Sequence, residues 1–147
     1  MRRWRPMNVP IPRVHVLALL SGFALQAMVP RRLLRRARIG RVIGWLFVAV
    51  GTTLAARAVR AAGTVDVSDP DVLVTRGPYA RSRNPMYVAW TGIYVGVALV
   101  RNTAWPIVLL PAVVFWTHVT VLAEECELER AFGAEYRTYR ERVPRYR

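Results

Sequence analysis

The residues of this 147-residue chain that are best suited to chemistry lie in two polar stretches, each adjoining a long apolar run. The first stretch reads Gly77-Pro78-Tyr79 and then Arg83-Asn84-Pro85-Met86-Tyr87. Gly77-Pro78 is a turn signal, and Asn84-Pro85 is typical of the N-cap and first turn of a helix. Arg83 and a tyrosine beside free N–H groups at a helix start suit a carboxylate or another polar ligand. On spacing alone, a capped turn with arginines facing lipid head groups remains the simpler interpretation.

The second stretch is acidic. Four of the nine acidic residues fall between Glu124 and Glu129. Because Glu124 and Glu125 directly follow an apolar run, they are costly unless they meet a cation, a hydrogen-bond donor or water. A cationic ligand, such as a sulfonium cofactor with an ammonium group and ribose hydroxyls, would suit them. A solvated helix end with a local pair of Glu127 and Arg130 explains the later glutamates better than the first two.

Three further features of the C-terminal third bear on chemistry. Tyr136, Tyr139 and Arg142 share one helical face, which lies either on the membrane interface or over a bound cofactor. His118 precedes Glu125 by seven residues, and an intramembrane histidine is either a functional group or a structural hydrogen bond across the bundle. The lone Cys126 excludes an intrachain disulfide and has no metal-ligand spacing around it. We therefore predict no metal site, and no side chain is singled out as catalytic.

The elements that must position these residues are four apolar segments between Arg-dense stretches. The chain is 54% hydrophobic and 21% charged, with a mean hydropathy of +0.21. This segregation is typical of an integral membrane protein, in which a crossing helix needs about 20 apolar residues and roughly 17 as a minimum. The segments cover about residues 14–29, 42–62, 86–100 and 104–123, and a helical tail follows over 124–147. We predict one all-α membrane domain of about four transmembrane helices, in which the first and third need flanking residues or a thinner bilayer.

Local signals refine this bundle. The three residues 101–103 leave room only for a tight antiparallel hairpin, and Pro106 and Pro111 predict a kink in the fourth helix. Gly92 and Gly96 predict a close helix contact on the third. The N-terminal segment resembles a signal peptide but offers a poor cleavage site, so we interpret it as a retained first span.

The net charge of +13 comes entirely from arginine, since the chain contains no lysine. The apolar runs argue against nucleic-acid binding, and basic loops beside spans bind anionic lipid head groups and fix topology. The N-terminus, the second loop and the tail hold 15 of the 22 arginines, which places both termini in the cytoplasm of a multi-pass cell-membrane protein. The six arginines of residues 31–41 break this rule locally. Either they are an exception, or the first segment does not fully cross.

The C-terminal half resembles a known family. The order Gly77-Pro78-Tyr79, Arg83-Asn84-Pro85-Met86-Tyr87, Glu124-Glu125 and a tail from Phe132-Gly133 to Val143-Pro144-Arg145 is similar to the isoprenylcysteine carboxyl methyltransferase and phospholipid methyltransferase superfamily. The match runs from Leu73 to Arg145, and its order and spacing are specific. The first two spans hold no diagnostic motif.

The resemblance implies that the cytoplasmic loop and tail enclose S-adenosylmethionine while a lipophilic methyl acceptor arrives from the bilayer. By position, it assigns cofactor binding to Gly77, Pro78, Tyr79, Arg83, Asn84, Pro85, Tyr87, Glu124 and Glu125, covered by Tyr136, Tyr139 and Arg142. Many relatives have histidine where this chain has Asn84, which hydrogen bonds but does not titrate near neutral pH. Because loop and tail each hold too few apolar residues to fold alone, we expect them to order together around the cofactor.

Two alternatives stay open. Related membrane folds include reductases that use a nicotinamide cofactor, and a non-catalytic membrane partner would also have short spans and an Arg-rich surface. The pair Glu124-Glu125, followed by the Phe132-Gly133 tail, favours the methyl donor. The acceptor is a phospholipid, an isoprenoid or a foreign lipophile, and no obligate protein partner is inferred.

Overall fold

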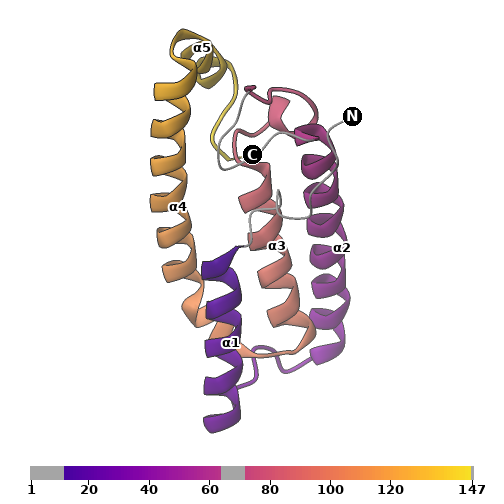
Figure 1. Ribbon diagram of the computed structural model, residues 1–147. Helices are drawn as coiled ribbons and strands as arrows, with labels where there is room; N and C mark the ends of the chain where they lie inside the picture. Colours follow the sequence, from indigo (N-terminus) through magenta and orange to yellow (C-terminus); the bar gives the residue numbers. More distant parts are fainter. Residues whose placement is uncertain (1–11, 64–71, 147) are drawn as a thin grey trace.

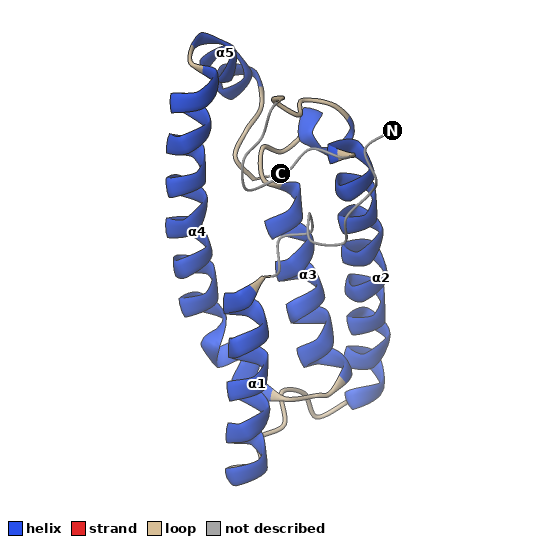
Figure 2. Cartoon of the chain, in the orientation of Figure 1, coloured by secondary structure: helices blue, strands red, loops and turns tan. Residues whose placement is uncertain are grey.

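The computed structural model describes residues 12–63 and 72–146 of the chain, and within these ranges every regular element is a helix (Figures 1 and 2). The elements in chain order are α1 (Arg13–Met28), α2 (Ala37–Ala62), the 3-10 helix η2 (Gly77–Ala80), α3 (Pro85–Val100), α4 (Ala104–Phe132) and α5 (Ala134–Arg142). The predicted all-α class is confirmed.

Two of these helices are long and apolar enough to cross a membrane. α2 and α4 have 26 and 29 residues, with mean hydropathies of 1.7 and 1.9 over their most apolar stretches. Only 17% and 22% of those stretches are buried, whereas the core helix of a soluble protein would be mostly buried. Large side chains such as Trp45, Leu46, Phe115 and Trp116 instead point outward. So much outward apolar surface is typical of helices that contact lipid or another protein. α1 and α3, with 16 residues each, are shorter.

α2 and α3 pack along most of their length, and glycines make this possible. A Cβ atom added at Gly96 would lie 2.7 Å from the carbonyl oxygen of Gly44, and one at Gly44 would lie 2.7 Å from that of Gly96. Gly51 meets Ala89 in the same way. The close contact predicted at Gly96 is therefore present, but its partner in the contact is Gly44. The prediction for Gly92 is wrong, since that residue faces open space.

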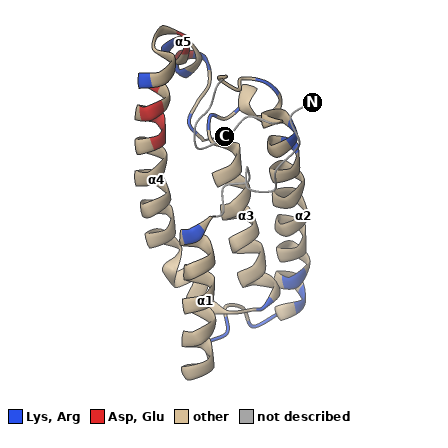
Figure 3. Cartoon of the chain, in the orientation of Figure 1, with Lys and Arg blue, Asp and Glu red and all other residues tan. Residues whose placement is uncertain are grey.

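The predicted α3–α4 hairpin is confirmed, and it also holds the preceding α1–α2 loop. Asn102, with a φ of 50°, accepts from the backbone N–H of Leu34 at 2.8 Å and donates to its carbonyl at 3.0 Å. The N–H of Ala104 donates to the carbonyl of Arg31 at 3.1 Å. The Arg-rich loop is thus fixed at the end of the bundle opposite α5 (Figure 3).

α1, with 16 residues, is shorter than the roughly 17 residues that a crossing helix needs. It begins beside the middle of α3, where the Nε2 of His15 lies 3.0 Å from the Oγ1 of Thr91 and its ring meets Tyr94 edge-on. Farther along, Gly22 packs on Pro106 at the start of α4. Figure 1 shows α1 beside only the half of α4 that is nearer the α3–α4 loop. The other halves of α3 and α4 therefore face one another without α1 beside them.

α4 continues past the predicted boundary at residue 123. It runs through Phe132, where Gly133 adopts a φ of 53° and lets the chain turn into α5. Pro106 lies in the first turn, where proline is tolerated, whereas Pro111 lies inside the helix. The acidic stretch from Glu124 to Glu129 is consequently part of a continuous helix that projects beyond the apolar segment (Figure 3).

Candidate functional site

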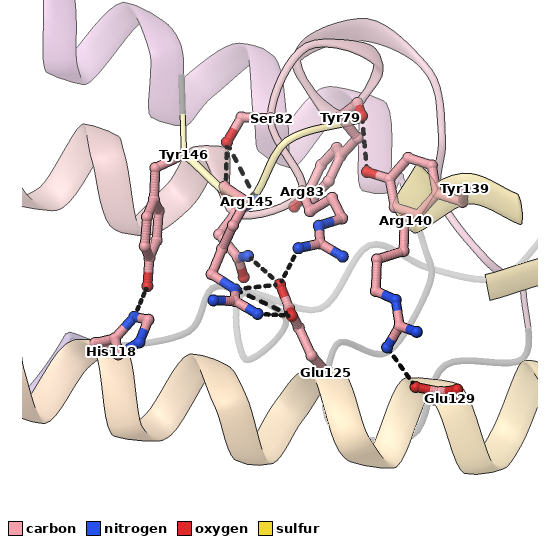
Figure 4. Close-up of polar contacts among 11 residues, drawn as sticks. Tyr79, Ser82, Arg83, His118, Glu125, Glu129, Tyr139, Arg140, Arg145 and Tyr146 are labelled. Carbon is pink, nitrogen blue, oxygen red and sulfur yellow. Dashed lines mark hydrogen bonds and ion pairs between the residues drawn. The ribbon is translucent and has the colours of Figure 1, made fainter. Parts of the chain in front are cut away.

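The candidate site lies where three segments meet: the loop from η2 to α3, the polar end of α4, and the tail with α5 (Figure 4). Backbone contacts join the loop to the tail. The N–H of Arg83 donates to the carbonyl of Pro144 at 2.9 Å, and the hydroxyl of Ser82 donates to that of Arg145 at 3.0 Å. The hydroxyl of Tyr139 donates to the carbonyl of Tyr79 at 2.7 Å. The loop and the tail, which are far apart in the sequence, thus form one wall of the candidate site.

An apolar cluster supports this wall. Tyr136, Tyr139 and Val143 are buried, and three partly buried residues from the loop and α4 pack on them, namely Leu73, Leu128 and Phe132. Loop and tail thus pack on one another, as expected of segments that hold too few apolar residues to fold alone, and their ordering around a cofactor stays a prediction. The aromatic rings of α5 supply the burial that the loop lacks.

Glu125 is the polar centre of the site. Its side chain is 8% exposed and accepts from three residues. Arg145 donates through Nε at 3.1 Å to both oxygens and through its Nη2 at 2.9 Å to Oε2. Asn84 Nδ2 donates to Oε1 at 3.1 Å, and the Nη2 of Arg83 lies 3.3 Å from the same oxygen. One carboxylate therefore ties the loop, α3 and the tail to α4.

Asn84 occupies the predicted N-cap position of α3, but its side chain does not cap the helix. The amide donates to Glu125 instead, 41 residues away in the sequence. Pro85 stands at the first helical position, as predicted. The N-cap pattern thus located the helix start correctly, while the side chain serves a tertiary contact.

Glu124 has a different environment from its neighbour. The hydroxyl of Tyr87 donates to its Oε1 at 2.5 Å. Burial raises the pKa of Glu124, the hydrogen bond from Tyr87 lowers it, and the charge of Glu127 raises it. Burial, and then the charge of Glu124, raise the pKa of Tyr79 to about 12. Glu124 therefore lacks the arginine partners of Glu125 and is the carboxylate better placed for a cationic ligand.

Buried donors without partners lie beside Glu125. Arg83 has a side chain that is 7% exposed, and its Nε and Nη1 find no hydrogen-bond acceptor among the described residues. Within the same described ranges, the buried hydroxyl of Tyr136 has no partner either. Burial and the charge of Glu125 raise the pKa of this tyrosine, so it stays a neutral donor. Leaving a buried donor unpaired costs about 1–3 kcal/mol. These atoms form an arrangement suited to an anionic group.

The structure brings together nine of the twelve predicted site residues, namely Tyr79, Arg83, Asn84, Pro85, Tyr87, Glu124, Glu125, Tyr136 and Tyr139. Gly77, with a φ of 62°, and Pro78 shape the preceding turn. Arg142 lies outside the cluster, since it is exposed and its Nε donates to the carbonyl of Thr138 in its own helix. Arg145 stands in its place. Arg145 lies beyond the end of α5, so the helical periodicity that selected Arg142 could not locate it.

Two neighbours of Arg145 were also missed, because neither has a distinctive signal of its own. Ser82 fixes the tail through its hydroxyl. Tyr146 lies 3.0 Å through its hydroxyl from the Nδ1 of His118, so this histidine has a hydrogen-bond partner in the tail. At the helix end, the surface ion pairs involve Glu129, which contacts Arg140 at 2.7 Å and Arg137 at 3.7 Å.

A cavity of about 290 Å³ lies between α3 and α4, next to Glu124 and its partner Tyr87. Its lining is mostly apolar and is formed by Tyr87, Val88, Thr91, Val114, Thr117, His118 and Tyr146. α1 reaches only the edge of this cavity, where His15 contacts the lining residue Thr91.

The fold and this site define a helical membrane protein with a built polar site at one end and an apolar cavity beside it. Residues 39–135 match the phospholipid methyltransferase family, and since this is more than half of the chain, the protein belongs to that family. The family implies a methyltransferase that acts on lipophilic substrates. The matched region begins in α2, which had no diagnostic motif, and ends just before Tyr136. No curated protein and no solved structure shows a match to the chain.

Proposed function

We propose that the protein transfers a methyl group from S-adenosylmethionine to a lipophilic acceptor that arrives from the bilayer. The observation that carries this proposal is the set of unpaired buried donors on Arg83 and Tyr136. The cofactor has a carboxylate, and a buried guanidinium whose Nε and Nη1 have no acceptor among the described residues, beside a tyrosine hydroxyl, fits such an anion. The residues present therefore fit the methionine end of the cofactor.

Glu124 and the wall formed by the loop and tail would make the other contacts with the cofactor. Glu124, half-buried and not paired with any arginine of the described residues, would accept from the ammonium group or the ribose hydroxyls. Tyr87 holds this carboxylate in place through its hydroxyl. S-adenosylmethionine supplies an activated methyl group, and the loop and tail would exclude water and fix its orientation. Such positioning accounts for much of the catalysis of an in-line transfer.

The membrane arrangement of the proposal has four crossing helices and both termini in the cytoplasm. α2 and α4 have sufficient length, and α1 and α3 would cross with help from flanking residues or a thinned bilayer. The site then lies at the cytoplasmic surface. The exposed apolar side chains of α4, such as Phe115 and Trp116, would face the lipid from which the acceptor comes.

The proposal is tested by incubating the purified protein with methyl-tritiated S-adenosylmethionine and a membrane lipid extract. We expect label in the organic phase, and we expect Arg83→Gln to remove most of it. Arg81→Gln is the matched control, since Arg81 is exposed and lies two residues away. Oxidation of NADPH by the same protein without methyl transfer would favour the reductase alternative and overturn the proposal.

A further inference from the structure

We infer that the cavity between α3 and α4 binds an uncharged lipophile with a hydroxyl group, and that His118 accepts the proton of that hydroxyl during methyl transfer. This inference rests on the proposed function, because it names the acceptor class of the same site. The inference restricts the methyl acceptor from lipophiles in general to neutral alcohols and phenols with an apolar body. It excludes a phospholipid head group and a fatty acid as ligands of the cavity.

The position of the cavity connects it with both the cofactor residues and the lipid. Tyr87 lines the cavity and donates to Glu124, so one side chain belongs to both sites. Val114, another lining residue, is 49% exposed and continues into the outward apolar surface of α4. α1 does not cover this part of α3 and α4 (Figure 1). Among the described residues, the cavity is therefore open toward the apolar surface of α4 at Val114, which gives an apolar molecule a route from the lipid.

The lining chemistry selects against charged acceptors. The seven described residues that line the cavity include no arginine, aspartate or glutamate. A phosphodiester or carboxylate would lose its hydration there without gaining a fixed countercharge, which is strongly unfavourable. The side chains of Thr91 and Thr117 and the hydroxyl of Tyr87 can exchange hydrogen bonds with a neutral hydroxyl. The volume of about 290 Å³ accommodates a ring and the first part of a chain.

His118 is the group in this lining that can accept a proton from the ligand. Its Nδ1 lies 3.0 Å from the hydroxyl oxygen of Tyr146 (Figure 4). When Nδ1–H donates to that oxygen, the other ring nitrogen has its lone pair available. The tail fixes Tyr146 because the adjacent Arg145 is bound to Glu125. Tyr146 is thus a positioning residue that sets the tautomer of His118.

The chemical step balances with these groups. The acceptor oxygen forms a bond to the methyl carbon while the carbon–sulfur bond of the sulfonium breaks. The proton of the hydroxyl passes to the free ring nitrogen of His118, and the sulfur leaves as a neutral thioether. A methyl ether and an imidazolium remain, and the imidazolium returns its proton to water. No oxidant or metal is needed.

A binding experiment tests the acceptor class without cofactor. The full chain in phosphatidylcholine nanodiscs is titrated with 4-octylphenol and with 4-octylanisole, which differ only in the hydroxyl, and empty nanodiscs correct for partitioning. We expect the phenol to bind about three- to tenfold more tightly than the ether, as one or two hydrogen bonds predict. His118→Leu and Thr117→Val should each reduce that ratio. Thr120→Val is the control that should retain it, because Thr120 is exposed and bonds to its own helix at Trp116. Equal binding of phenol and ether by the wild type overturns the inference.

A transfer experiment tests the role of His118. With S-adenosylmethionine, we expect methylation of 4-octylphenol but not of phosphatidylethanolamine, a fall in kcat of about 100-fold in His118→Leu, and a smaller fall in Tyr146→Phe. Unchanged kcat in His118→Leu, or methylation of the phospholipid alone, contradicts the inference. Binding of S-adenosylhomocysteine distinguishes a failure of the proposed function from a failure of the acceptor inference. If the wild type fails to bind it, the proposed function fails; if both wild type and His118→Leu bind it while the predicted acceptor preference is missing, only the acceptor inference fails.

Discussion

At Glu125, a single buried carboxylate accepts from Arg83, Arg145 and Asn84, which belong to the loop, the tail and the start of α3. Adjacent in the sequence, Glu124 meets only the hydroxyl of Tyr87 among the contacts of the described residues. The two glutamates therefore have separate roles: Glu125 assembles the site, and Glu124 remains available to a ligand. A buried carboxylate that is bonded on both oxygens is costly to neutralise, because its cationic partners then lose their countercharge.

We expect Glu125→Gln to detach the tail from α4 and to lower the free energy of unfolding by about 3–5 kcal/mol. Thermal unfolding in detergent measures the stability, and trypsin cleavage within α5 reports the release of the tail. Glu127→Gln is the matched control, since Glu127 is an exposed glutamate on the same helix end. Equal stability and equal cleavage rates for the two variants would contradict the assembling role of Glu125.

Glu124 predicts a pH dependence. Because burial raises its pKa above 4.5, this carboxyl binds its proton more tightly in the folded protein than in the unfolded chain. Its contribution to stability is then present below about pH 4.5 and is lost as the pH rises through the raised pKa. We expect the unfolding temperature of Glu124→Gln to fall less than that of the wild type between about pH 4.5 and pH 7. Identical pH profiles of the wild type and Glu124→Gln would show that the carboxyl of Glu124 has the same pKa in the folded and unfolded states, which would contradict the prediction.

Among the elements, α2 and α3 pack along most of their length, and two glycines of α3 differ in what an added methyl group would meet. A Cβ at Gly96 would lie 2.7 Å from the backbone of Gly44, so Gly96→Ala should cost about 1–3 kcal/mol by forcing the helices apart. Gly92→Ala, the same substitution one turn away, meets open space and should stabilise the helix by about 0.5–1 kcal/mol. Thermal unfolding of the two variants checks this order, and the reverse order would contradict the packing.

The elements themselves could be predicted from local pattern. Apolar runs located four helices, Asn84 and Pro85 located the start of α3, and the motif order placed the loop beside the tail. The errors came from tertiary contacts. Periodicity chose Arg142, whereas the chain turns after α5 and presents Arg145. The contact of Gly44 with Gly96 depends on the rotation of two helices, which hydropathy does not report.

For the whole molecule, the distribution of charge distinguishes the two ends of the helical bundle. The end near α5 holds the site and all six described acidic residues, while the opposite end presents the arginines of the α1–α2 loop (Figure 3). If the site faces the cytoplasm, that Arg-rich loop lies on the outer side, fixed by Asn102 rather than placed by charge alone. Its arginines are then suited to anionic lipid head groups of the outer leaflet.

We therefore expect Arg35→Cys to react with an impermeant thiol reagent in intact cells, and Glu141→Cys to react only after the membrane is opened. Both substitutions are made in a Cys126→Ser background, and both positions are exposed. Labelling of Glu141→Cys alone in intact cells would reverse the proposed orientation.

The central claim is that the donors of Arg83 and Tyr136 bind the carboxylate of S-adenosylmethionine. Calorimetric titration of the purified protein with S-adenosylhomocysteine, which has the same carboxylate, tests it most directly. We expect saturable binding by the wild type, affinity about three- to tenfold lower in Tyr136→Phe, unchanged affinity in Arg81→Gln, and no binding of NADPH. Binding of NADPH in place of S-adenosylhomocysteine, or equal affinity in Tyr136→Phe and wild type, would contradict the account.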